Sequence, residues 1–458
     1  MTQTGFFPAI QVRRVSYMSL TKTVGFVAVT TLAIGGAAFG TEQNNDTLAQ
    51  IAELKAQIAS LKGAENGQWL TEQRASEIRG IVTDVLADAE TRSSLQGAAA
   101  GSGYNGGFFL SSADGNYSMK INVLEQIRWS FNNSENGTNP STTTQANGFE
   151  NKRTRLTFGG NMVDSSWNYK LAYYLAYSND AEFSGQAAPI LADAFVSKDF
   201  SNGFTVTVGQ FKLPFSAEYN LDAGNLQFTD YSLANTIAGQ IIGGGYGQGI
   251  QFGYSADQFR VHGAYVNAIS EQNQSWNAGS PGTEWALSGR AEFKFAGDWG
   301  QFNDAQSWKG EAFGAVAGLG YSSEMIDDAA GTNPSALTLD ITVDFGGANV
   351  TAAYYWADAD TTAGNNPTAY VLAGGVFLAD DFELVARYES IDNDTGANDS
   401  FGTFSVGGNW YVSKNAAKVS VDLGYGMDAF PTDQLYANWV AANQDGQWVV
   451  RGQMSFSF

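Results

Sequence analysis

The feature that most constrains the fold is an alternation of apolar and polar residues that recurs along short segments from Tyr117 to the C-terminal Phe458. Successive side chains of a β-strand point to opposite faces, so a period of two predicts amphipathic strands. In one segment the alternating residues are Leu337, Thr338, Leu339, Asp340, Ile341, Thr342, Val343, Asp344 and Phe345. A soluble sandwich would bury the same apolar face, so alternation alone does not separate a sandwich from a membrane barrel.

The lengths of the connections separate the two architectures, because outer-membrane barrels have short periplasmic turns and long extracellular loops. The connections here alternate in that way, except that 296–309 should be a short turn and is long. Either this connection carries an insertion or the strand count is wrong by a hairpin. We expect a closed, all-β antiparallel transmembrane barrel of about sixteen strands with an aqueous lumen. The expected strands are 116–131, 152–163, 166–178, 190–200, 203–211, 246–255, 258–268, 284–295, 310–322, 336–345, 348–357, 368–378, 381–391, 401–412, 416–426 and 446–458.

The composition agrees with an exported β-protein. The 458 residues include 53 Gly and no Cys, 13% are aromatic, and the mean hydropathy of -0.20 is too polar for a helical membrane protein. After the N-terminus no apolar run reaches the about 18 residues of a transmembrane helix. The formal net charge of -22 argues against nucleic acid as a partner. No pair of His or Cys residues is available for a transition metal, and no cofactor is expected.

The first 40 residues are expected to be a signal peptide. Lys22 precedes an apolar stretch over residues 24–38, and Ala38 and Gly40 provide the small residues of a cleavage site. Met18 would open a signal peptide of ordinary length. The preceding Arg13-Arg14 pair is then either part of a twin-arginine signal or upstream sequence from a misplaced start.

Residues 41–97 are expected to form a short α-helical or coiled-coil segment in the periplasm, followed by a linker over 98–115 and the barrel over 116–458. Apolar residues recur at spacings of three and four, close to a heptad. These residues are Leu48, Ile51, Leu54, Ile58 and Leu61, then Ile78, Ile81, Val85 and Leu86. Each stretch is too short for a stable isolated helix. Three copies meeting beneath a trimer, a flexible linker and a helix packed on its own barrel all remain open.

The C-terminal segment predicts the location of the protein. Residues 446–458 alternate strictly, and Trp448, Val450 and Met454 share a face with the terminal Phe458. A final amphipathic strand that ends in Phe resembles the signal read by the outer-membrane assembly machinery. We therefore expect the protein in the outer membrane of a Gram-negative-type (diderm) bacterium.

Three motifs resemble the phosphate-selective porin O/P family. They are Lys152-Arg-Thr-Arg-Leu-Thr-Phe-Gly-Gly160, Leu191-Ala-Asp-Ala-Phe195 and Gly209-Gln-Phe-Lys-Leu-Pro-Phe215, of which the last is the most specific. The resemblance runs from about Gly107 to the C-terminus and is strongest in the first half. It implies a 16-stranded passive channel that assembles as a homotrimer. The helical segment before the barrel looks like an addition found in some members.

Phosphate selectivity does not follow from this resemblance. An anion must exchange its water for fixed positive charge, which requires a ladder of Lys and Arg at the constriction. From Tyr104 onward the chain has 16 Lys and Arg residues against 37 Asp and Glu residues. The candidate constriction loop, residues 213–245, has no Lys or Arg and carries Glu218, Asp222 and Asp230.

The candidate site is a positively charged wall that faces this negatively charged loop. The inward positions of the first three strands and of the closing strand carry six basic residues, which are Lys120, Arg128, Arg153, Arg155, Lys170 and Arg451. If the loop folds into the lumen, a transverse field would order water and select polar solutes by dipole and size. In the alternative interpretation these side chains only solvate the lumen, paired with acids such as Glu125 or Glu150.

We therefore expect a porin, without enzymatic activity, for passive diffusion of small hydrophilic solutes and ions, surrounded by outer-membrane lipid. The alternative is a structural barrel that tethers the envelope to the cell wall through residues 41–97. An outer-membrane hydrolase would have to use His262, the only histidine, and no nucleophile motif accompanies it.

Overall fold

The computed structural model describes residues 52–56, 76, 78–84, 101–134, 145–177, 189–235, 245–269, 282–327, 331–360, 366–394, 400–430, 438–439 and 446–458. The chain divides into two units, residues 1–93 and 94–458. In the first unit the described residues 52–56, 76 and 78–84 are helical, and the helical segment over 41–97 stays a prediction. The signal peptide and most of the helical segment lie outside the described residues. No helix among the described residues is long and apolar enough to cross a membrane.

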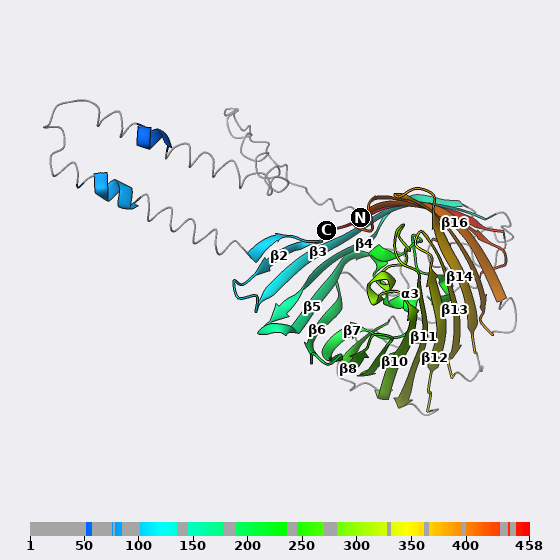
Figure 1. Ribbon diagram of the computed structural model, residues 1–458. Helices are drawn as coiled ribbons and strands as arrows, with labels where there is room; N and C mark the ends of the chain where they lie inside the picture. Colours follow the sequence, from blue (N-terminus) through cyan, green and yellow to red (C-terminus); the bar gives the residue numbers. More distant parts are fainter. Residues whose placement is uncertain are drawn as a thin grey trace, which may run out of the picture. The chain divides into compact units, whose positions relative to one another are not determined.

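The second unit is a closed antiparallel barrel of sixteen strands (Figure 1). Each strand pairs with the next in sequence, and β18 pairs with β3 to close the barrel. Phe458 completes this closure, because its N–H donates to Val123 O at 3.0 Å and its O accepts from Val123 N at 2.7 Å. The strands are β3 (Ser118–Asn133), β4 (Gln145–Met162), β5 (Asp164–Tyr177), β6 (Ile190–Asp199), β7 (Phe204–Lys212), β8 (Tyr246–Ser255), β9 (Phe259–Val266), β10 (Gly282–Ala296), β11 (Gly314–Asp327), β12 (Ser335–Asp344), β13 (Ala348–Asp358), β14 (Thr368–Phe377), β15 (Phe382–Asp392), β16 (Ser400–Ser413), β17 (Ala417–Gly426) and β18 (Trp448–Ser457).

The prediction of a sixteen-stranded barrel is confirmed. The long connection after β10, residues 297–313, is an insertion that contains the 3₁₀ helix η4 (Trp299–Asn303) and no further strand. The stretch 98–115, expected as a linker, contains two short strands, β1 (Ser102–Tyr104) and β2 (Phe108–Ser111). They form a hairpin, and β2 pairs with the first residues of β3, which extend beyond the end of β18.

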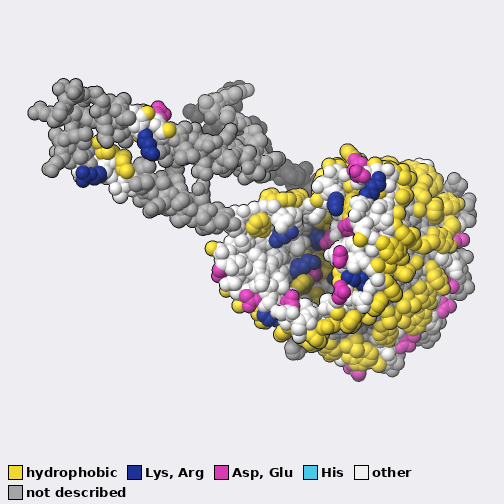
Figure 2. All heavy atoms as spheres, in the orientation of Figure 1, with side chains coloured by type: hydrophobic (Ala, Val, Ile, Leu, Met, Phe, Trp, Pro, Cys, Tyr) yellow, Lys and Arg dark blue, Asp and Glu magenta, His cyan; other side chains and the backbone are white. Residues whose placement is uncertain are grey.

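The alternation sorts side chains between the outside of the barrel and the lumen. On β12, Leu339 and Ile341 are 49% and 43% exposed, whereas Thr338 and Asp340, which precede them in alternation, are 0% and 9% exposed. Figure 2 shows the apolar side chains over the outer wall and charged side chains inside the hollow mouth. An outward apolar face suits a lipid solvent, and closure leaves no unpaired strand edge within it.

Candidate channel constriction

The described part of the connection between β7 and β8, residues 213–235, folds into the lumen. It contains α3 (Ala217–Asn220), drawn inside the barrel in Figure 1, and the 3₁₀ helix η3 (Ala223–Asn225). Both short helices begin with a side-chain cap. Ser216 Oγ accepts from Tyr219 N at 3.0 Å, and Asp222 Oδ1 accepts from Gly224 N at 2.9 Å. We refer to residues 213–235 as the constriction loop.

The base of the constriction loop is fixed by close packing. Leu213 N donates to Gly245 O at 2.8 Å, where the chain returns to β8. Gly245 has a φ of +74°, and a Cβ there would lie 1.4 Å from the Tyr219 hydroxyl, so only glycine fits. Leu213, Phe215 and Leu233 are at most 2% exposed and belong to the largest apolar cluster inside the barrel. The loop is therefore packed against the wall.

Asp230 joins the loop to the basic wall. Its carboxylate accepts from Arg128 at 2.7 Å and from Arg153 at 3.0 Å, and Lys152 Nζ lies 3.2 Å away. Burial alone would raise the pKa of Asp230, but the charges of Arg128, Lys152 and Arg153 hold this pKa well below its usual range. The side chains of Arg128 and Arg153 are 0% exposed, because the loop covers them. Solvent in the lumen therefore does not reach either guanidinium.

The alternation of β4 assigns Arg153 to the lumen and thereby assigns Lys152 to the outside. A β-bulge changes this arrangement, because Gln126 pairs with Arg153 while the next residue, Ile127, pairs with Asn151. Lys152 is the extra residue, and its side chain is buried beside Asp230. The expected strand began at residue 152, so the shift in alternation that the bulge causes lay at its edge, and sequence reasoning missed Lys152.

Asp222 makes a second contact between the loop and the wall. Its carboxylate is hydrogen-bonded to the Arg155 guanidinium. Burial alone would raise the pKa of Asp222, yet the charge of Arg155 lowers this pKa below its usual range. Together with Asp230, Asp222 brings two of the three expected loop acids against the expected basic residues.

The other expected basic residues lie apart from these two contacts. Lys170 pairs with Asp193 of β6 at 2.7 Å, and Arg451 donates to Asp422 of β17 at 2.6 Å. Asp422 also accepts from Thr229 Oγ1 of the loop at 2.6 Å. Asp422 therefore bridges Arg451 and the loop. Lys120 lies beneath the turn between β1 and β2, with Nζ 3.6 Å from the position of a Cβ on Gly106.

Glu218, the third expected acid, faces the opposite wall. It accepts from Ser232 N at 2.7 Å and lies 3.9 Å from the Arg387 guanidinium of β15. Burial raises the pKa of Glu218, against the opposing effects of Arg387 and the Ser232 hydrogen bonds. Arg387 also donates to Asp230 O at 3.0 Å and lies over the Phe228 ring. The alternation of β15 places Arg387 inward, but the sequence analysis did not include Arg387 among the expected basic residues of the lumen.

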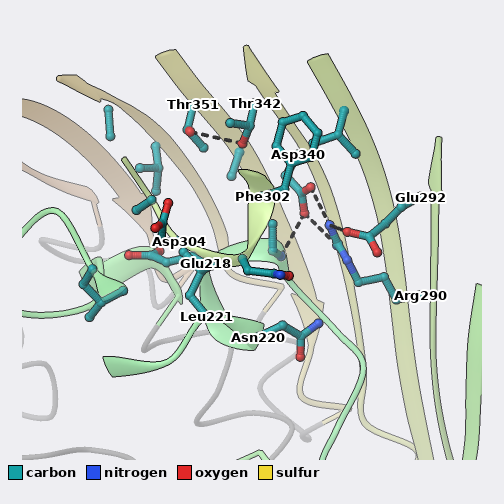
Figure 3. Close-up of a pocket in the computed structure, with 18 of the residues that line it drawn as sticks. Glu218, Asn220, Leu221, Arg290, Glu292, Phe302, Asp304, Asp340, Thr342 and Thr351 are labelled. Carbon is teal, nitrogen blue, oxygen red and sulfur yellow. Dashed lines mark hydrogen bonds and ion pairs between the residues drawn. The ribbon is translucent and has the colours of Figure 1, made fainter. Parts of the chain in front are cut away.

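A cavity of about 360 Å³ lies between the constriction loop and the strands from β9 to β15. Arg290 of β10 lines its wall, where Figure 3 shows it between Asp340 and Glu292. Its guanidinium donates to Asp340 at 2.7 and 2.8 Å, to Glu292 at 3.1 Å and to Phe215 O at 2.9 Å. Arg260 pairs with the same Glu292. Cations and carboxylates therefore alternate along this side of the lumen.

The residues on which a catalytic or metal-binding alternative would depend can be located in the structure. His262 of β9 lines the cavity, and its Nδ1 atom has no hydrogen-bond partner. No group of three or more His, Cys, Asp or Glu residues within the described ranges is arranged to hold a metal ion.

Comparisons with known proteins agree with this architecture. The anion-selective porin from Comamonas acidovorans is 13% identical and matches with a TM-score of 0.51, covering 74% of this chain and 98% of that chain. OmpF of Salmonella typhi, in a complex with daunomycin, gives the same identity and TM-score, covering 75% of this chain and 98% of that chain. At such identities the likeness shows the fold alone. A comparison with curated protein sequences gives no match.

The sequence model of the family described as phosphate-selective porin O and P matches residues 121–366, which is more than half of the chain. This match contains the three motifs at 152–160, 191–195 and 209–215 as well as the constriction loop. The protein is therefore an outer-membrane β-barrel channel for small solutes in a Gram-negative-type bacterium, and it belongs to the phosphate-selective porin O and P family.

Proposed function

We propose that the protein is a passive, non-enzymatic diffusion channel for small hydrophilic solutes and ions, without the phosphate preference in its family's name. The observation that carries the proposal is the neutralisation of the basic residues at the constriction. Arg128, Lys152 and Arg153 surround Asp230, and Arg290 lies between Glu292 and Asp340. Phosphate would need fixed positive charge that is free to replace its water.

The proposed solute path runs between the constriction loop and the wall from β9 to β15. Arg128 and Arg153 are fully buried, so in this proposal they anchor the loop, whereas Arg260, Arg290 and Arg387 line the cavity. Glu218 of the loop lines the same cavity. Opposite charges across a narrow wet passage would orient water and favour small polar solutes over bulky or apolar ones.

The proposal extends to processing and assembly. Residues 1–40 would be removed as a signal peptide, 41–97 would form the periplasmic helical segment, and barrels over 116–458 would form a homotrimer in outer-membrane lipid. The helical residues 52–56 and 78–84 leave the envelope-tethering function as a second candidate. Deleting residues 41–97 should leave conductance intact if the protein is a channel, and should loosen the envelope if it is a tether to the cell wall.

Planar-bilayer recording of the refolded protein tests the channel proposal. We expect stepwise conductance, a reversal potential in a KCl gradient that is near zero or leans to cations, and no block by added phosphate. Strong anion selectivity with phosphate block would overturn the claim about selectivity. A protein that inserts and does not conduct would overturn the channel itself and leave the tether as the function.

A further inference from the structure

The connection over residues 297–313 differs from every other described turn at its end of the barrel. The other turns at this end contain between one and four residues, such as Val163 between β4 and β5 and residues 345–347 between β12 and β13. Short turns mark the periplasmic end of an outer-membrane barrel. The barrel closes without this insertion, so barrel closure does not explain why it is long. Its contacts with the rest of the barrel indicate what it does.

The connection reaches four other periplasmic turns. Trp299 Nε1 donates to Ala256 O at 3.0 Å, and Gly346 N donates to Ser307 Oγ at 3.1 Å. Lys309 Nζ lies 3.6 Å from Asp380, and Asn415 Nδ2 donates to Gln306 Oε1 at 2.8 Å. These turns belong to strands from β8 to β17, so the segment extends across part of the periplasmic opening.

Aromatic packing holds the segment in this position. Trp308 is 7% exposed, and its ring lies 5.2 Å from the ring of Phe377 and 4.8 Å from that of Tyr411. Phe377 and Tyr411 come from β14 and β16, so the contact ties the segment to the inner wall. A buried aromatic cluster of this kind adds to the hydrogen bonds in fixing one position of the chain.

The segment also contacts the constriction loop directly. Ala305 N donates to Asn225 O at 3.1 Å, and Asn225 Nδ2 donates to Asn303 O at 3.1 Å. Gln306 Nε2 donates to Leu226 O at 3.2 Å. The loop that enters from the extracellular end and the segment that enters from the periplasmic end therefore meet inside the lumen.

Residues 302–305 of the segment line the same cavity as the loop residues Glu218 and Leu221 (Figure 3). One oxygen of Asp304 accepts from Trp308 Nε1 at 3.1 Å, whereas the other, Oδ1, is buried without a hydrogen-bond partner. Asp304 as a residue lines the cavity, and a carboxylate in the wall of a solute path attracts a cation and repels an anion.

We infer that residues 297–313 form a second, periplasmic constriction in series with the constriction loop, and that Asp304 makes this exit favour small cations and neutral solutes over anions. The inference rests on the proposed channel function. The solute would pass first along the charged wall at Arg290 and then past Asp304 on its way to the periplasm.

Single-cysteine chemistry tests the inference on the folded channel, because the natural chain has no cysteine. The test variant is Asp304→Cys, and the control is Asp298→Cys, an exposed position in the same connection. A bulky methanethiosulfonate reagent is added to each variant in a planar bilayer. We expect modification at residue 304 to lower the single-channel conductance roughly twofold and to be reversed by a thiol reductant, because a narrow exit dominates the resistance. Modification at residue 298 should leave the conductance unchanged.

A charge substitution tests whether Asp304 sets the ion selectivity of the exit, as distinct from the width of the passage. Asp304→Lys should raise the Cl⁻ to K⁺ permeability ratio roughly threefold in a KCl gradient, with Asp298→Lys as the matched control. The inference is overturned if the wild type conducts and both residue-304 variants behave as their residue-298 controls do. If the wild type itself does not conduct, the proposed channel function fails instead.

Discussion

The two sides of the lumen use the same kinds of charged residue in different ways. On the covered side, made by β3, β4, β17 and β18, Arg128, Arg153 and Arg451 are at most 1% exposed and bind the constriction loop or its partner Asp422. On the open side, made by β9, β10 and β12, Arg260 and Arg290 line the cavity, although Arg290 is itself only 3% exposed. A side chain that points inward lies in the lumen. Whether a solute can reach that side chain depends on where the constriction loop runs.

The pairing of charges has a different consequence on each side. A buried ion pair is costly to break, because the remaining charge has lost its water and has no partner. On the covered side, breaking a pair should therefore release the loop. On the open side the partners adjoin a wet cavity, so removing one charge should alter the field that a solute meets and leave the loop in place.

The largest effect is expected for Asp230→Asn on the covered side. The change leaves Arg128, Lys152 and Arg153 without their shared carboxylate. Release of the loop should become more favourable by about 3 kcal/mol, the usual consequence of removing one partner from a buried ion pair. We expect larger and noisier single-channel conductance, together with faster proteolysis of the loop.

The matched control is Asp193→Asn, which removes a carboxylate from a partner, Lys170, whose side chain is 38% exposed. Asp193 is buried, but Lys170 remains partly in water after the change, so the loss should be smaller than for Asp230. If Asp230→Asn and Asp193→Asn give the same conductance and the same proteolysis rate as wild type, the covered side does not hold the loop.

The next effect is expected for Glu292→Gln on the open side. Glu292 contacts both Arg260 and Arg290, and Arg290 keeps Asp340 after the change. The loop should remain in place while net positive charge appears beside the cavity. We expect the Cl⁻ to K⁺ permeability ratio to rise roughly twofold at unchanged proteolysis. Asp380→Asn is the control, since this residue is almost fully exposed at a periplasmic turn. An altered proteolysis rate in Glu292→Gln would remove the distinction between the two sides.

A smaller effect is expected on lowering the pH, which should act on the periplasmic exit. Burial, opposed in part by the Trp308 hydrogen bond and by Lys418 and reinforced by Glu311, raises the pKa of Asp304 to about 6. Because a raised pKa means protonation at a higher pH, Asp304 is charged above about pH 6 and neutral below it. The cation preference of the wild type should therefore fall as the pH decreases through about 6, and that of Asp304→Asn should show no such step.

The sequence predicted the barrel well because its determinants are local. Alternation along each strand, such as Leu337 to Phe345, and the lengths of the connections depend on neighbouring residues and on the lipid outside. The insertion at 297–313 was visible as a long connection, but its position inside the lumen was not, because that depends on contacts with residues as distant as Asn225 and Asn415.

The candidate site was less predictable for the same reason. Alternation marks Arg128, Arg153 and Arg290 equally as inward, and only the path of the constriction loop separates covered from open positions. Lys152 faces the lumen through a bulge at the edge of the expected strand, where too few residues remained to show the shift in alternation. The pairing of Asp230 joins residues about a hundred positions apart along the chain, beyond the reach of any local pattern.

The smallest effect is expected for Lys120→Gln, which tests how far the covered side extends. Lys120 is an inward residue of β3 like Arg128, but it lies beneath the turn at Gly106 and Gly107, and β3 pairs there with β2, beyond the end of β18. Since its charge is remote from the constriction loop, we expect conductance, ion selectivity and proteolysis all to remain as in wild type. A change in selectivity comparable with that of Glu292→Gln would place Lys120 on the solute path, and the distinction between covered and open sides would then need a third region at the periplasmic rim.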